Sequence, residues 1–111
     1  MLQYLRYRRL VQQVRQALAN PAVASHNAET LSAALNMSPR SLHRQLQEEG
    51  ASLQQLKDEV RFERAKDLLL RTARPIKQVA AASGFRNEKS FTRAFHEWSG
   101  ETPVGFRKRS A

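Results

Sequence analysis

Residues 76–95 read IKQVAAASGFRNEKSFTRAF, and residues 28–46 read AETLSAALNMSPRSLHRQL. Each stretch combines a short apolar helix, a tight turn and a second helix whose outer face carries arginine and other long polar side chains. Small residues in the first helix of each stretch allow two helices to cross at close range, as in a helix-turn-helix. The two stretches therefore predict a pair of helix-turn-helix units in an all-α protein.

The two stretches align as an internal repeat, with one additional residue in the second turn. The alignment keeps apolar residues at packing positions, a residue suited to a left-handed backbone in the turn, and an arginine on the outer face. The aligned pairs are Leu31 with Val79, Asn36 with Gly84, Met37 with Phe85, Leu42 with Phe91, Arg44 with Arg93, and Leu46 with Phe95. Packing of short helices explains the apolar matches alone, whereas the matched arginine favours DNA binding.

Capping and helix-breaking residues divide the rest of the chain into further helices. We expect about seven helices and no strands, over residues 3–19, 28–35, 39–49, 53–72, 76–83, 88–98 and 103–106. The expected organisation is a first helix-turn-helix subdomain over 1–50, a connecting helix over 51–73, and a second subdomain over 74–111. The apolar stripe of the connecting helix shifts around its axis, so this helix should pack against a different core at each end. Its length of about 30 Å is close to the ~34 Å turn of duplex DNA.

The chain is strongly basic. It has 111 residues, with 19 Lys and Arg against 10 Asp and Glu, and a formal net charge of +9. This charge favours a polyanionic partner, with nucleic acid ahead of an anionic membrane. The absence of cysteine excludes disulfides and cysteine-ligated zinc, and no apolar run is as long as a membrane span. We therefore expect a cytoplasmic protein without cofactor or metal, whose basic N-terminal segment is an amphipathic helix rather than a signal peptide.

Most of the chain, from about Val11 to Phe106, resembles the DNA-binding domain of the AraC/XylS family of bacterial transcription regulators. SPRSLHRQL is similar to the first recognition helix of that family, and IKQVAAASGF followed by SFTRAFHEWSGETPVGFR is similar to its more diagnostic second half. The signature positions are occupied by Phe85, Phe91, Phe95, Gly100 and Pro103. The stretch QEEGASL is one residue shorter than the commoner form and resembles a subgroup of the family.

The resemblance implies two subdomains at the ends of the connecting helix. Each would insert a recognition helix into one of two successive major grooves on one side of double-stranded DNA. RNA polymerase is an expected protein partner. Because this domain often follows a ligand-sensing, dimerising domain in the family, we expect the chain to be a C-terminal fragment, with a small single-domain regulator as the alternative.

Three residues of the first recognition helix are expected to read bases. The side chains on its outer side are those of Arg40, His43, Arg44 and Gln47. Arg44 is the leading candidate, because arginine can make a bidentate contact to guanine in the major groove. The resemblance supports Arg40 and His43 as its neighbours. The structural alternatives are an ion pair between Arg44 and Glu48 one turn later and an ordinary solvated side chain for His43.

Four residues of the second recognition helix are expected to read bases, namely Glu88, Lys89, Thr92 and Arg93. Arg93 is the leading candidate here, for the same reason as Arg44 in the first unit. Thr92 could contact a thymine methyl group or a phosphate, and Glu88 could accept from a cytosine amino group. The alternative for Glu88 is stabilisation of the helix N-terminus, where an acidic side chain is favourable.

Ser38, Ser41 and Asn87 are expected to contact phosphate at the N-termini of the recognition helices. Five further cations are expected to be solvated or to face phosphate, namely Lys77, Arg86, Arg107, Lys108 and Arg109. Trp98 and Phe106 fit a hydrophobic core better than a stacking platform for bases.

Two other classes of function are alternatives to DNA binding. A basic helical module could bind a protein or RNA instead of duplex DNA. An enzyme is the weakest alternative, because His26, His43 and His96 are scattered and form no recognisable acid–base pair. The chain also has no glycine-rich phosphate-binding loop.

Overall fold

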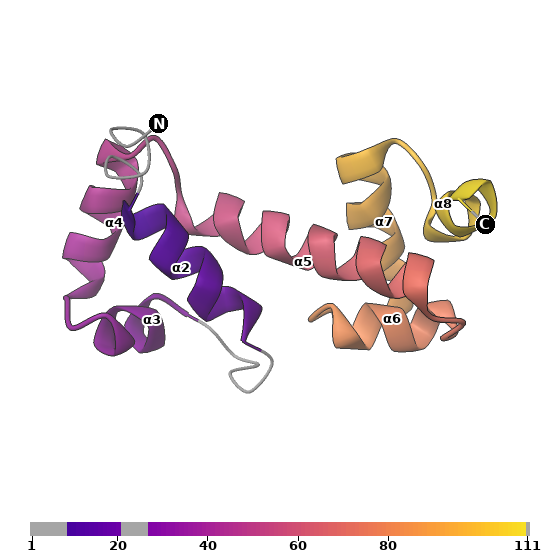
Figure 1. Cartoon of the computed structure of the whole chain (residues 1–111), viewed down its shortest axis with the longest axis horizontal. Coiled ribbons are helices and arrows are strands. Elements are labelled where there is room, and N and C mark those ends of the chain that lie inside the picture. Colours follow the sequence, from indigo (N-terminus) through magenta and orange to yellow (C-terminus); the bar gives the residue numbers. More distant parts are fainter. Residues whose placement is uncertain (1–8, 21–26, 111) are drawn as a thin grey trace. The chain divides into compact units, whose positions relative to one another are not determined.

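The computed structural model describes residues 9–20 and 27–110, and its regular elements are all helices (Figure 1). The described part contains α2 (Arg9–Ala19), α3 (Ala28–Ala34), α4 (Pro39–Glu48), α5 (Leu53–Arg71), α6 (Ile76–Ala82), α7 (Glu88–Ser99) and α8 (Pro103–Ser110). These seven helices confirm the expected all-α class. Residues 3–8 of the expected first helix, and His26, lie outside the described residues.

Contacts divide the chain into two compact units, a first unit of residues 1–60 and a second unit of residues 61–111. Helix α5 contributes to the core of both. Its first half supplies Leu53 and Leu56 to the core of the first unit, and its second half supplies Ala65 and Leu69 to the core of the second. This confirms that the connecting helix packs against a different core at each end.

The core of the first unit is aliphatic. Its buried residues are Leu10, Val11, Val14, Leu18, Leu31, Leu42, Leu46, Ala51, Leu53 and Leu56. The carboxylate of Glu49, just after α4, accepts hydrogen bonds from the backbone amides of Leu10 at 3.2 Å and Val11 at 2.9 Å. These bonds satisfy amides in the first described turn of α2 and fix that helix against the end of α4.

The core of the second unit is aromatic. The rings of Phe62, Phe91 and Phe106 lie 5.4–5.8 Å from that of Phe95, in edge-on or tilted contacts. Trp98 packs on Phe62 with the ring centroids 5.5 Å apart. Trp98 and Phe106 are thus part of the packing of this unit, as the sequence predicted.

Local capping accounts for most of the helix ends. Asn27 accepts from the backbone amide of Thr30 at 2.8 Å, and the hydroxyl oxygen of Thr30 accepts from the amide of Asn27, which completes a capping box. Ser52 accepts from the amide of Gln55 at 3.2 Å at the start of α5. Gly50 ends the first unit's recognition helix with a φ of 78°, a conformation that disfavours other residues.

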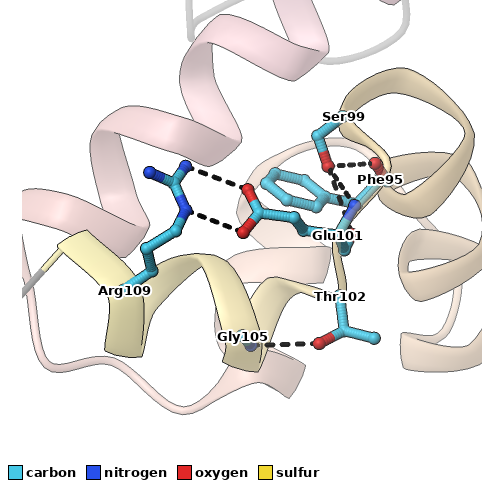
Figure 2. Close-up of polar contacts among 6 residues, drawn as sticks. All are labelled: Phe95, Ser99, Glu101, Thr102, Gly105 and Arg109. Carbon is cyan, nitrogen blue, oxygen red and sulfur yellow. Dashed lines mark hydrogen bonds and ion pairs between the residues drawn. The ribbon is translucent and has the colours of Figure 1, made fainter.

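The last helix is longer than the sequence predicted. α8 runs to Ser110 instead of ending at Phe106. Thr102 caps its start by accepting from the amide of Gly105 at 3.0 Å, and Figure 2 shows this contact. Arg109, in its last turn, forms a bidentate ion pair with Glu101 at 2.7 and 2.9 Å. These contacts support the additional turn, and Arg109 is not simply a solvated charge.

Arg107 also departs from the expectation of a solvated or phosphate-facing side chain. Its guanidinium group donates to the carbonyl oxygens of Leu69 at 3.1 Å, Thr72 at 3.3 Å and Arg74 at 2.7 Å. These carbonyls lie at the end of α5 and in the turn that follows it. Carbonyls at a helix C-terminus have no amide partner within the helix. Arg107 therefore joins α8 to the α5–α6 turn.

Candidate nucleic-acid interface

The helix-turn-helix of the first unit consists of α3, a short turn and α4. Leu31 of α3 and Leu42 and Leu46 of α4 are no more than 1% exposed, so these side chains form the contact between the two helices and the core. The turn contains Asn36 with a φ of 58°, the left-handed conformation that the sequence predicted. Ser38 then caps α4 by accepting from the amide of Ser41 at 3.1 Å.

The second unit repeats this arrangement with α6 and α7. Val79, Phe91 and Phe95 are fully buried at the positions equivalent to the three leucines of the first unit. Gly84 has a φ of 91° in the turn, and Asn87 caps α7 by accepting from the amide of Ser90 at 2.8 Å.

The backbone hydrogen bonds of the two turns also correspond. The amide of Met37 donates to Ser32 at 2.9 Å, and the amide of Phe85 donates to Ala80 at 3.0 Å. The sequence repeat is therefore a repeat of local structure, with the same left-handed turn residue and the same buried positions in each unit.

The face of α4 opposite its buried leucines carries the predicted base-reading residues of the first unit. Arg40, His43 and Arg44 are all exposed. No ion pair joins Arg44 to an acidic side chain within residues 9–20 and 27–110, so the proposed pairing with Glu48 is not formed there. The guanidinium group of Arg44 is thus available to an external partner.

The predicted residues of α7 lie together at one surface depression. It is shallow and lined by Glu88, Lys89, Thr92 and Arg93. Lys89 and Arg93 are exposed and Thr92 is half-buried. Glu88 occupies the first turn of α7, where its charge also stabilises the helix N-terminus, so both of its predicted roles are compatible with the structure.

Two of the three residues predicted to contact phosphate, Ser38 and Asn87, act as helix caps in the structure. The oxygens of Ser38 and Asn87 accept from backbone amides, and the Ser38 hydroxyl donates to the Ser41 oxygen at 3.0 Å. Capping leaves the Asn87 Nδ2 group and the Ser41 hydroxyl as donors at the start of each recognition helix. Their contact with phosphate stays a prediction.

One exposed residue of the same face was not among the predicted readers. His96 follows Arg93 by three positions on α7, just as Gln47 follows Arg44 on α4, and both His96 and Gln47 are exposed. Residues three apart on a helix share a face, so this spacing was the signal that could have pointed to His96.

The described residues lack the features of a metal site and of a membrane span. The His, Asp and Glu residues within 9–20 and 27–110 form no group of three or more that could hold a metal ion. No helix in this described part of the chain has the length and apolar character needed to cross a membrane.

Comparison with known proteins assigns the family. A helix-turn-helix domain family matches residues 31–109, which include the second repeated unit and all but the first three residues of the first. The chain belongs to the AraC/XylS family of transcription regulators. It contains the DNA-binding domain of this family, and the resemblance seen in the sequence is confirmed.

Two relatives of this AraC-type domain come from Pseudomonas aeruginosa. The HTH-type transcriptional regulator VqsM is 36% identical over 73 residues, and the Ornithine utilization regulator is 38% identical over 74 residues. The matches cover 66% and 67% of this chain but only 22% of each relative. The AraC-type chain therefore spans less than a quarter of the length of these two regulators.

Solved structures with the same fold include other AraC-type domains. A DNA-binding transcriptional dual regulator from Escherichia coli K-12 has a TM-score of 0.86 and 30% identity, with 91% of each chain covered. A probable AraC family regulator from Rhodopseudomonas palustris has a TM-score of 0.75 and 26% identity, covering 92% of this chain and 97% of that one. The DNA-binding domain of AdpA, solved with a target DNA, has a TM-score of 0.72 and 26% identity, covering 93% and 90%.

Proposed function

We propose that this domain recognises a specific duplex DNA sequence by inserting α4 and α7 into two successive major grooves. Arg44 and Arg93 are the principal base readers, each making a bidentate contact to guanine. The neighbouring bases are contacted or bordered by Arg40 and His43 on α4 and by the residues that line the depression on α7. Ser38, Ser41 and Asn87 contact phosphate and set the depth of the two helices.

The observation that carries this proposal is the structural equivalence of Arg44 and Arg93. Each lies two residues after a fully buried side chain, Leu42 or Phe91, and two residues before another, Leu46 or Phe95. A helix buried at those positions presents the intervening arginine to solvent. Two equivalent exposed arginines on repeated recognition helices fit two separate base-reading sites.

The connecting helix fits the spacing of such sites. α5 has 19 residues, which corresponds to about 28 Å at 1.5 Å per residue. This length is comparable to the ~34 Å between equivalent points of neighbouring major grooves. We infer that α5 acts as the spacer between the two sites.

Selection of bound duplexes from random DNA tests this function directly. We expect two enriched blocks whose centres lie about 10.5 base pairs apart, each containing a preferred guanine. A pool that is retained without enrichment of any sequence would contradict the proposal. Binding of single-stranded RNA in preference to every duplex would contradict it as well.

The complete regulator is proposed to act in the bacterial cytoplasm with further partners. Because the chain spans only a small part of its relatives, we infer that an effector-binding or dimerising domain accompanies it in the whole protein. RNA polymerase is the proposed partner in transcription. The domain itself is proposed to act without enzymatic activity.

A further inference from the structure

The positive charge of the chain is distributed unevenly between its two units. Residues 61–111 carry 12 Lys and Arg against 5 Asp and Glu, a formal charge of +7. Residues 1–60 carry 7 against 5, a formal charge of +2. Affinity for the phosphate backbone depends on the cations that can neutralise phosphates, so the two units are not equivalent as polyanion binders.

The same asymmetry holds within the helix-turn-helix repeat itself. Residues 28–50 contain two arginines and three glutamates, a formal charge of −1. Residues 76–100 contain four cations and two glutamates, a formal charge of +2. The recognition segment of the first unit therefore lacks a net electrostatic attraction to DNA, whereas that of the second unit has one.

Structural alignment of the repeat identifies the residues responsible. Lys77 is the second residue of α6 and Glu29 is the second residue of α3, so a lysine in one unit replaces a glutamate in the other. Arg86 lies at the additional position in the longer turn between α6 and α7 and has no counterpart in the first unit. Lys77, Glu29 and Arg86 are all exposed.

The cations Lys77 and Arg86 are also not neutralised within the unit. In the described part of the second unit, ion pairs join Arg71 to Asp67 at 2.7 Å within α5, and Arg109 of α8 to Glu101 at 2.7 Å. Neither Lys77 nor Arg86 forms an ion pair with a described acidic residue. Their charge is therefore directed to solvent or to a partner.

We propose that the second unit is the electrostatic anchor of the domain, with Lys77 and Arg86 contacting DNA phosphates beside the second recognition helix. The first unit contributes base selectivity with little sequence-independent attraction of its own. This inference rests on the proposed function, because it divides the work of duplex binding between the two units. Binding to duplex DNA of arbitrary sequence then depends on the second unit. Once the second unit is bound, the first unit is held near the DNA and engages its own site.

The salt dependence of binding to a duplex of arbitrary sequence tests the anchor. Each phosphate contact contributes about 0.9 to the slope of log affinity against log salt. In the Lys77→Gln/Arg86→Gln variant the slope should fall by about 1.8. Between 50 and 200 mM salt, the wild-type chain should thus lose about 12-fold more affinity than this variant. Unchanged far-ultraviolet circular dichroism would establish that both chains are folded.

The matched control removes two cations from the first unit. Arg9→Gln/Lys57→Gln makes the same change in net charge outside the recognition helices, and it should leave the slope within about 0.5 of the wild-type value. Equal losses of slope in the two double variants would show a response to total charge and would overturn the anchor. An undiminished slope in Lys77→Gln/Arg86→Gln would overturn it too. Absence of duplex binding by the wild-type chain would instead refute the proposed function, from which the anchor follows.

Discussion

Arg44 and Arg93 have the same local surroundings in two different units. Both are exposed on a recognition helix and are flanked by fully buried residues two positions away on each side. Their exposure could be predicted from helical periodicity, because a buried position fixes the direction of its neighbours along the helix. The base that each one would contact could not be predicted, because it depends on how the helix sits in the groove.

Replacing either arginine should weaken specific binding and alter base preference locally. We expect Arg44→Ala and Arg93→Ala each to cost roughly 1–3 kcal/mol, with the loss confined to one block of the binding site. Affinities measured across a set of single-base variants of the selected site would locate the affected position. Arg86→Ala is the control, since loss of a phosphate contact should weaken all duplexes alike. An unchanged base profile in both arginine variants would refute their assignment as readers.

Two buried serines should respond in opposite ways to substitution. Ser32 and Ser83 are each 1% exposed, but only the Ser32 hydroxyl has an acceptor, the carbonyl of Glu29 at 3.1 Å. The Ser83 oxygen has no hydrogen-bond partner among the described residues. Ser32→Ala should therefore destabilise the chain by about 1 kcal/mol, whereas Ser83→Ala should leave stability unchanged or raise it by about 1 kcal/mol. Denaturant titration checks this, and a clear loss of stability in Ser83→Ala would contradict the unsatisfied hydroxyl.

Helix starts illustrate what local sequence can determine. The caps Asn27, Ser38 and Asn87 can be placed from local sequence, because a cap depends on a side chain and an amide only three residues apart. The extension of α8 to Ser110 was not predicted. Arg107, in the extended part, contacts carbonyls 33–38 residues earlier in the chain, and such contacts leave no local pattern.

Removal of the Arg107 side chain should loosen the second unit. Arg107→Ala deletes three hydrogen bonds from a charged donor to the α5–α6 turn, and we expect a loss of roughly 2 kcal/mol of stability. Arg107→Lys should restore only part of it, because an ammonium group cannot reproduce the planar fork. Hydrogen exchange should show the largest change in α8 and at the end of α5. Lys108→Ala, an exposed neighbour, is the control, and equal effects of the two alanine variants would contradict the role of Arg107.

The ion pair that supports the end of α8 should make a small contribution that disappears in acid. The hydrogen bonds from Arg109 lower the pKa of the Glu101 carboxyl below its ordinary value. A lowered pKa in the folded state stabilises the protein above the unfolded pKa, and that stabilisation is lost as pH falls through the folded value. Glu101→Gln should therefore lower the melting temperature at about pH 7, and this difference should shrink as pH falls below the ordinary glutamate pKa of about 4.3. A melting-temperature difference that persists unchanged at acidic pH would contradict the charge-based account.

At the scale of the whole molecule, the sequence was sufficient to predict two repeated helix-turn-helix units joined by one long helix. The repeat could be recognised in the sequence because both turns need a left-handed residue, Asn36 or Gly84. Both recognition helices also need buried residues at the same spacing. The different chemistry of the two cores followed from composition, with leucines in the first and phenylalanines in the second. The unequal charge of the two units can be read from the sequence, and comparison of equivalent positions, such as Glu29 and Lys77, locates residues that cause it.

The central claim is that both recognition helices engage one side of the same duplex. Hydroxyl-radical footprinting of the wild-type chain on its selected site tests this most directly. The account predicts two protected patches about 10.5 base pairs apart, with Arg44→Ala weakening one patch and Arg93→Ala weakening the other. A single protected patch, or two patches on opposite sides of the duplex, would contradict it.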